Sequence, residues 1–303
     1  MRIAALCCPI AALLSIAPSH APASVRLHPA VAAGPSEAAR TARYWTPARM
    51  RSAQPLGAAP GARLTALASF APVSEPAVPP HSVNGRLFLR QGRKRGYCSA
   101  TAVDTPSRSL VLTAAHCLNS GPEERGPRGR RVKGVWSSYL EFVPAYSGGT
   151  APFGAFVAYR KSVFALRQWV RSGNPNFDVG ALVVSPNAEG VAVADAVGGG
   201  VAIATDLSRR QEFQTFGYPG KSRWLQGCDS PYVGDDTLTY RIPGPPTIAI
   251  RCHWAPGASG GGWLIEDGGA INGLTSYGKQ GDRRHTFSPY FSSRNVGRLA
   301  AGL

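Results

Sequence analysis

The stretch Leu112-Thr113-Ala114-Ala115-His116-Cys117 decides how the rest of the chain is interpreted. It closes the apolar run 109–113, which is typical of a buried β-strand, and it places a histidine and then a cysteine directly after that strand. A single histidine in such a place is most often a satisfied core side chain. Two later segments change that interpretation, namely 176–182 (Asn-Phe-Asp-Val-Gly-Ala-Leu) and 256–263 (Pro-Gly-Ala-Ser-Gly-Gly-Gly-Trp).

Together the three segments present a histidine, an aspartate and a serine in the order His116, Asp178, Ser259. A serine hydroxyl is a weak nucleophile near neutral pH, whereas an adjacent imidazole can take its proton and later give it to a leaving amine. A carboxylate on the other ring nitrogen fixes the tautomer and stabilises the charged ring. The glycines around Ser259 allow a tight turn in which backbone N–H groups converge on a developing oxyanion.

These segments resemble those of the trypsin-like (chymotrypsin-fold) serine peptidases, in which T-A-A-H-C carries the base, D-[IV]-A-x-L the acid and G-x-S-G-G the nucleophile. The resemblance spans about residues 83–300 and is strongest to the bacterial secreted type, including the glutamyl-endopeptidase-like group. It implies a serine endopeptidase that forms an acyl-enzyme on Ser259, with His116 as base and Asp178 as its partner. It places the oxyanion hole at the N–H groups of Gly257 and Ser259, and the chemistry requires neither a metal nor an organic cofactor.

The implied fold is all-β, with two antiparallel barrels of six strands each and a short C-terminal helix. The texture of the chain after residue 81 favours a β fold independently, because short apolar runs alternate with Gly, Pro, Asn and Asp turns and no amphipathic helix intervenes. Only 163–171 and 295–303 look helical. The expected strands cover 86–89, 99–103, 109–113, 139–143, 156–159, 179–184, 212–216, 247–250, 262–265 and 273–277.

The first 80 residues have a different composition. Arg2, the apolar run 3–17 and Ala21-Pro22-Ala23 predict a signal peptide over 1–23, so the protein is expected to be secreted or periplasmic. Residues 24–80 are rich in Ala, Pro and Arg and too poor in periodic apolar positions to fold alone, which predicts a disordered propeptide or linker. The peptidase domain is expected over 81–303.

Four cysteines remain once Cys7 and Cys8 leave with the signal peptide. No C-x-x-C pair occurs among them, so disulfides are favoured over zinc, and three pairings are open. The family resemblance implies the pairs Cys98–Cys117 and Cys228–Cys252.

The same resemblance assigns the substrate pocket. His253, six residues before Ser259, stands where digestive trypsins have an Asp, so cleavage after Lys or Arg is not expected. Thr275, Ser276, Tyr277 and Gly278 are expected to form the side of the pocket and to pair with the substrate backbone as an added strand. Two hypotheses stay open: His253 and Thr275 favour an acidic side chain, or His253 faces solvent and the pocket takes small or apolar groups.

The position before the nucleophile is Ala258, where the digestive enzymes carry an Asp that receives the new amino terminus on activation. Arg86 is preceded by no I-V-G-G start either. Activation through that ion pair is therefore not expected, and bacterial members commonly lack it.

The chain carries 33 Lys and Arg against 17 Asp and Glu, a net charge of +16. Seven Arg against two acids in residues 1–80 account for +5, which leaves +11 on the expected domain. This scattered, Arg-dominated charge favours steering of acidic substrates or retention near an anionic surface over specific nucleic-acid recognition. The expected partner is a peptide or protein substrate, and the expected state is a monomer.

Three alternatives compete with the endopeptidase. A catalytically silent peptidase homologue would bind a partner, but His116, Asp178 and Ser259 are all present. A basic cell-surface or nucleic-acid binder would need a contiguous Arg stripe with interleaved aromatics. The G-x-S-x-G elbow of α/β-hydrolases needs a helix after the serine, and the glycines 260–262 disfavour one.

Overall fold

A computed structural model of the 303-residue chain describes residues 35–57, 70–125 and 129–301. The predicted signal peptide lies outside these ranges. Within them, no helix combines the length and the apolarity that crossing a bilayer requires.

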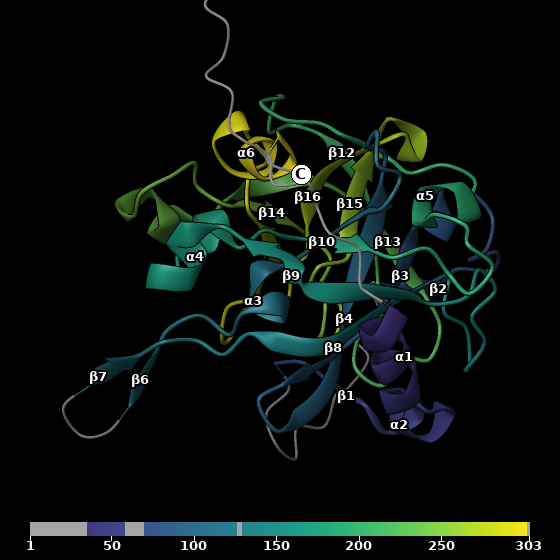
Figure 1. The fold of residues 1–303 in the computed structure, drawn as a ribbon. Coiled ribbons are helices and arrows are strands. Elements are labelled where there is room, and N and C mark those ends of the chain that lie inside the picture. The colour runs from purple at the N-terminus through teal and green to yellow at the C-terminus, as the bar shows by residue number, and fades with distance from the viewer. Residues whose placement is uncertain (1–34, 58–69, 126–128, 302–303) are drawn as a thin grey trace, which may run out of the picture.

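The first half of the described domain is a closed antiparallel barrel (Figure 1). Its strands run in the order β4-β3-β8-β9-β10-β5, and β5 pairs back onto β4 through Ala102 and Val111. Leu87, Leu112 and Leu182 lie fully buried in its core. The strands are β3 (Asn84–Gln91), β4 (Lys94–Val103), β5 (Leu110–Thr113), β8 (Ser137–Pro144), β9 (Phe156–Ala165) and β10 (Gly180–Val184).

Short elements decorate the ends of this barrel. The helical ones are η1 (His81–Val83), α3 (Ala115–Leu118), α4 (Arg167–Ser172) and η2 (Pro175–Phe177). A hairpin of β6 (Glu123–Arg125) and β7 (Arg130–Val132) projects from it.

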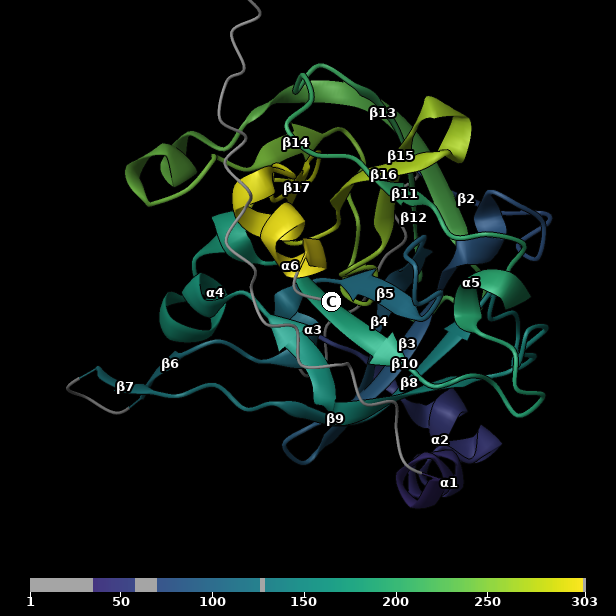
Figure 2. The same ribbon diagram turned by 45° about the horizontal axis from the view of Figure 1, so that its top comes forward.

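The second half forms another antiparallel sheet, in the order β16-β15-β12-β13-β14-β17 (Figure 2). The loop between Tyr277 and Phe287 is closed by two backbone hydrogen bonds. Tyr277 N donates to Phe287 O at 3.3 Å, and Phe287 N donates to Tyr277 O at 2.9 Å. The fully buried ring of Trp263 lies in the core. The strands are β11 (Ala202–Ile203), β12 (Glu212–Gly217), β13 (Gln226–Asp235), β14 (Ile248–Ile250), β15 (Gly262–Ile265), β16 (Ala270–Leu274) and β17 (Thr286–Ser288). Helical turns are α5 (Val193–Ala196), η3 (Thr237–Arg241), η4 (Glu266–Gly268), η5 (Ser293–Gly297) and α6 (Arg298–Ala301).

The predicted all-β double barrel is thus confirmed, with local differences. The expected helix over 163–171 begins only at Arg167, because Val163 and Ala165 pair with β10. The expected strand over 273–277 is displaced toward the amino terminus, since β16 ends at Leu274. The expected helix over 295–303 is realised as the π-helical turn η5 followed by α6.

Part of the segment predicted to be disordered is folded, so that prediction is wrong for 35–57 and 70–80. Helices α1 (Pro35–Tyr44) and α2 (Pro47–Ser52) lie beside the first barrel (Figure 1). Trp45 is only 3% exposed and its Nε1 donates to Tyr139 O at 2.6 Å. The Tyr44 ring stacks on that of Tyr139 with centroids 4.1 Å apart. A segment too poor in apolar residues for its own core can therefore fold by adding a few aromatic anchors to an existing barrel.

Two short strands continue this segment onto the domain. Strand β1 (Gln54–Pro55) pairs in parallel with β4, and β2 (Ala71–Pro72) pairs with β13. The segment therefore contacts both barrels.

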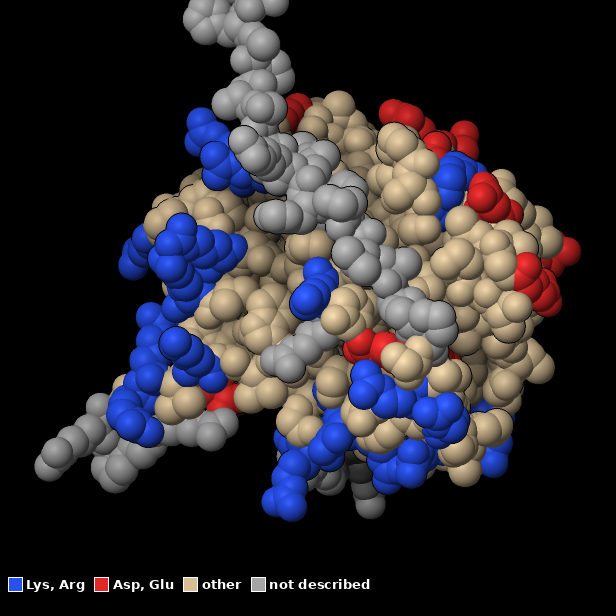
Figure 3. All heavy atoms as spheres, in the orientation of Figure 1, with Lys and Arg blue, Asp and Glu red and all other residues tan. Residues whose placement is uncertain are grey.

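The charge is divided unequally between the barrels. Residues 81–184 hold 15 Lys and Arg against 5 Asp and Glu, a net +10, whereas residues 185–303 hold 11 against 10, a net +1. Figure 3 shows basic side chains over the lower and left parts of one face and most acidic ones at its upper right.

Candidate active site

A cleft of about 720 Å³ is lined by residues of both barrels. His116 and Ser259 both line it, and so do all the residues predicted to form the substrate pocket: His253, Thr275, Ser276, Tyr277 and Gly278. Asp178 lies behind His116 and is only 2% exposed. Three segments that are far apart in the sequence therefore meet at one place.

His116 and Asp178 form a tightly bonded pair. The backbone N of His116 donates to Asp178 Oδ1 at 2.8 Å, and Nδ1 of its ring lies 2.7 Å from Oδ2. Because a carboxylate only accepts, the ring proton belongs on Nδ1, and Nε2 of the neutral ring is free to accept a proton. Burial lowers the pKa of His116, but the charge and hydrogen bond of Asp178 outweigh it, so the pKa is raised overall.

Local structure holds this pair in place. His116 lies on the single turn α3 that follows β5, while Asp178 follows the turn η2 and precedes β10. Asn174 caps that turn, its Oδ1 accepting from Asn176 N at 2.9 Å. Ser276, from the second barrel, donates its hydroxyl to Asp178 Oδ2 at 2.6 Å. The carboxylate is thus oriented by groups from both barrels.

Around Ser259, the peptide carbonyls are bonded away from the serine. Pro256 O accepts from Gly220 N at 2.8 Å, and Ala258 O accepts from Gly261 N at 2.9 Å. In a trans peptide the N–H points opposite to the C=O of the same unit, so the N–H groups of Gly257 and Ser259 point the other way. Across the described ranges, neither N–H donates to a protein acceptor. Both are therefore free to bind an oxyanion.

Gly257 cannot readily be another residue. Its φ is +98°, and a Cβ there would lie 2.6 Å from Tyr218 O and 2.8 Å from the Tyr97 ring. The predicted need for glycine next to Ser259 thus has two causes, a left-handed backbone and close packing behind it.

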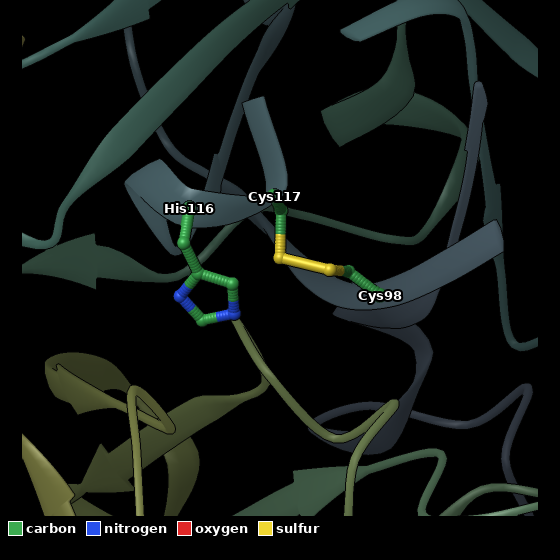
Figure 4. A group of neighbouring side chains, drawn as sticks. All are labelled: Cys98, His116 and Cys117. Carbon is green, nitrogen blue, oxygen red and sulfur yellow. A yellow bond between two sulfur atoms is a disulfide. The ribbon is translucent and has the colours of Figure 1, made fainter. Parts of the chain in front are cut away.

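Ser99 connects the first barrel to the loop that carries Ser259, residues 256–261, called the serine loop below. Its N donates to Ser259 O at 2.8 Å and its hydroxyl donates to Gly257 O at 3.0 Å. It follows Cys98, whose disulfide to Cys117 has an S–S distance of 2.02 Å (Figure 4). This disulfide and the second, Cys228–Cys252, confirm the predicted pairing. The first one therefore joins the neighbour of His116 to the neighbour of Ser99.

Cys98, Cys117 and His116 also lie close enough to suggest a metal site, with their potential ligand atoms within 4.8 Å of one another. The two sulfur atoms are bonded to each other, so neither is a thiolate that could ligate a metal.

The cleft is lined by several basic side chains. His253, Lys279 and Arg283 line it, and no Asp or Glu of the described residues does. Lys279 Nζ lies 2.7 Å from Asp236 Oδ1, so its charge is partly neutralised. His253 Nδ1 is buried and finds no hydrogen-bond partner among the described residues. Thr275 Oγ1 accepts from Trp263 Nε1 at 3.0 Å, which occupies one of its lone pairs and leaves its hydroxyl hydrogen to donate.

Three cleft residues that the sequence did not indicate come from the amino-terminal segment: Leu56, Gly57 and Phe70. Leu56 N donates to Tyr97 O at 2.9 Å. The Phe70 ring stacks on that of Trp254, with centroids 5.0 Å apart and planes 5° from parallel. An aromatic residue at the end of a segment poor in aromatics was the one signal that could have indicated this contact.

Comparison with known proteins finds similarity at the level of solved structures. No protein-family model and no curated protein matches the sequence. The solved structure of the protease Anisep from Arthrobacter nicotinovorans is 28% identical, with a TM-score of 0.63 over 73% of this chain and 96% of that one. The thermostable serine protease AL20 from an extremophilic microorganism is 27% identical, with a TM-score of 0.62 over 73% of this chain and 95% of that one.

The chain is thus similar in fold to bacterial serine proteases of the trypsin-like, chymotrypsin-fold type. A Glu endopeptidase, 15% identical, shares the fold with a TM-score of 0.57 over 78% of this chain and 97% of that one.

Proposed function

We propose that the protein is a secreted serine endopeptidase that hydrolyses peptide bonds through an acyl-enzyme on Ser259. The observation that carries the proposal is the His116–Asp178 pair, which shares one cleft with Ser259 and its two unbonded N–H groups. A silent homologue has no need for a buried carboxylate that orients an imidazole toward this cleft.

In the proposed reaction, Ser259 Oγ attacks the substrate carbonyl carbon while His116 Nε2 accepts the hydroxyl proton. The carbonyl oxygen becomes an oxyanion that accepts hydrogen bonds from Gly257 N and Ser259 N. His116 then gives the proton to the leaving amine, the C–N bond breaks and the acyl-enzyme remains. A water molecule, deprotonated by His116, attacks the acyl carbon. The bond from that carbon to Ser259 Oγ then breaks, His116 returns the proton to Oγ, and the acid product leaves. Asp178 keeps the ring oriented and stabilises its charged form throughout.

Unpaired backbone groups beside Ser259 are available to bind the backbone of a substrate. The carbonyl of Ser276 and both backbone groups of Gly278 make no backbone hydrogen bond in the part of the chain that the structure describes. Such groups favour binding of an extended peptide as an added strand. Both residues line the cleft beside Ser259.

Basic side chains that line the cleft support a preference for acidic over basic substrate residues. His253 and Arg283 supply positive or hydrogen-bonding groups there, with no acid to attract Lys or Arg. A cleavage profile measured on a mixed peptide library checks this. A profile dominated by Arg or Lys would exclude the preference, and one dominated by small or apolar residues would favour the alternative in which His253 does not bind substrate.

Export is supported by two disulfides, which persist in oxidising compartments, and by the predicted signal peptide. A fluorophosphonate probe tests the chemistry. The purified full chain should be labelled, and Ser259→Ala should not. An unlabelled wild type, or labelling that survives Ser259→Ala, refutes the assignment, whereas peptide hydrolysis lost in the variant supports it.

A further inference from the structure

Arg86, on β3, is a buried cation without an acidic partner. It is 4% exposed, and no carboxylate of the described chain forms an ion pair with it. Its guanidinium carbon lies 4.2 Å from the centre of the Tyr97 ring, 4.6 Å from that of Tyr146 and 4.9 Å from that of Tyr218. Its Nε has no hydrogen-bond acceptor. Burial lowers the pKa of its guanidinium.

Such an arrangement is a poor way to stabilise a fold. Burying an uncompensated charge is unfavourable by several kcal/mol, and contacts with aromatic faces return only about 0.5–2 kcal/mol each. An apolar side chain of similar length would fill the same space without that cost. The arginine therefore needs another explanation.

Arg86 is linked to the serine loop through the segment 218–222. The guanidinium of Arg86 donates to Ser222 O, and the hydroxyl of Tyr97 donates to Gly220 O. The segment 218–222 is thus held by two side chains of the first barrel. From the same segment, Gly220 N donates to Pro256 O at 2.8 Å.

Pro256 C=O and Gly257 N–H belong to one peptide unit, so the bond from Gly220 fixes the direction of that N–H. Without it the carbonyl is free to turn toward the cleft, and the N–H turns away from it. One of the two donors to the oxyanion would then be lost.

We propose that Arg86 is a positioning residue, which holds 218–222 so that Gly220 keeps the Pro256–Gly257 peptide oriented for oxyanion binding. The proposal rests on the proposed function for its catalytic consequence, but the grip of Arg86 on the segment is a structural claim that can be measured separately.

Arg86→Met tests it, because methionine retains much of the length and the apolar contacts but neither donates hydrogen bonds nor carries charge. We expect kcat per titrated active site to fall about 10- to 100-fold with KM within about threefold, since the lost interaction acts on the transition state. The affinity for a peptide boronate, which places an oxygen in the oxyanion hole, should fall by a similar factor. The melting temperature should stay equal or rise.

Amide hydrogen exchange gives a readout that needs no activity. Peptides covering 218–222 and 256–259 should exchange faster in Arg86→Met. Tyr97→Phe, which removes only the hydroxyl that reaches Gly220 O, should change kcat and exchange in the same direction. Glu141→Gln is the matched control, a buried ionisable side chain on β8 with no bond to this segment. It should leave kcat unchanged and should not speed exchange in either peptide.

Unchanged exchange in Arg86→Met overturns the proposal, and so does wild-type kcat per active site in an active enzyme. A kcat loss shared equally by Glu141→Gln would overturn it as well. If the wild type neither reacts with fluorophosphonate nor cleaves peptides, the proposed function fails, and hydrogen exchange alone then decides whether Arg86 holds the segment.

Discussion

Asp178 accepts three hydrogen bonds, from the backbone N and the ring Nδ1 of His116 and from the Ser276 hydroxyl, while almost completely buried. The sequence indicated the pairing with His116 through the family motif. It indicated Ser276 only as a wall of the pocket, because a bond that crosses between barrels leaves no local pattern. The residue that carries the chemistry was thus predictable, and the residue that orients it was not.

The raised pKa of His116 predicts the acid side of the activity profile. The base must be neutral to accept a proton, so kcat should rise with pH around a midpoint above 6.5, the ordinary histidine value. Asp178→Asn removes the groups that raise the pKa, so the midpoint of its residual activity should move to lower pH, and kcat should fall about 10⁴-fold. A pH–rate profile of both proteins measures this. An unshifted midpoint in the variant would contradict it.

Glu141 should make the free energy of unfolding fall as pH rises, whereas a carboxylate in an ion pair makes it rise. Burial raises its pKa from 4.5 to about 8, so the folded state holds the proton more tightly than the unfolded one. The contribution of Glu141 to the free energy of unfolding is fully present below pH 4.5 and is lost as pH rises through about 8. Glu141→Gln should therefore gain stability over wild type between these limits, by on the order of a few kcal/mol at the upper end.

Urea unfolding at several pH values measures that difference. A constant difference between the two proteins across pH 4.5 to 8 would show that Glu141 does not keep its proton in the folded state.

At the level of elements, the two disulfides serve different parts of the cleft. Cys117 follows His116, whereas Cys252 precedes His253. Replacing Cys98 and Cys117 by Ala should lower kcat, and replacing Cys228 and Cys252 by Ala should chiefly raise KM. In each double variant the free energy of unfolding should fall by about 2–5 kcal/mol. Steady-state kinetics with denaturant unfolding measures both, and identical kinetic effects of the two double variants would contradict the division.

Strands that are continuous apolar runs, such as those predicted over 109–113 and 179–184, were placed to within a few residues, because β5 and β10 are buried at every position. Strand β13 was missed, since Gly227, Pro231 and Gly234 interrupt the pattern although its backbone still pairs with β12. Helix α1 was missed for another reason. Its stability comes from packing on β8 and β9, which local composition does not report.

Phe70 shows the functional side of the amino-terminal segment. Its ring occupies cleft space against Trp254, so Phe70→Ala should enlarge that space and raise kcat/KM several-fold for peptides with bulky residues. Val191→Ala, a truncation at a side chain that is 36% exposed and away from the cleft, is the control. An equal or lower kcat/KM in Phe70→Ala would mean that the ring supports the cleft rather than restricts it.

For the whole molecule, the unequal charge of the barrels matters more than the total. With +10 on residues 81–184 and +1 on 185–303, attraction of acidic substrates is directed toward one side of the cleft. The kcat/KM ratio of acidic to neutral peptides should therefore fall as ionic strength rises, since screening shortens the range of the field to about 10 Å at 0.1 M salt. A salt-independent ratio would remove this role for the charge.

The bonds from Ser99 to the serine loop join the first barrel to the second, and the proposed catalytic residues are divided between these two halves of the chain. His116 and Asp178 lie in one barrel and Ser259 in the other, and each barrel contains its own disulfide. The connection between β10 and β11 passes the exposed residues Glu189 and Gly190. A chain divided there would yield two fragments, neither of which holds a nucleophile and a base together. Peptide cleavage would return only when the fragments reassociate, which makes the pair a complementation reporter for proteins fused to them.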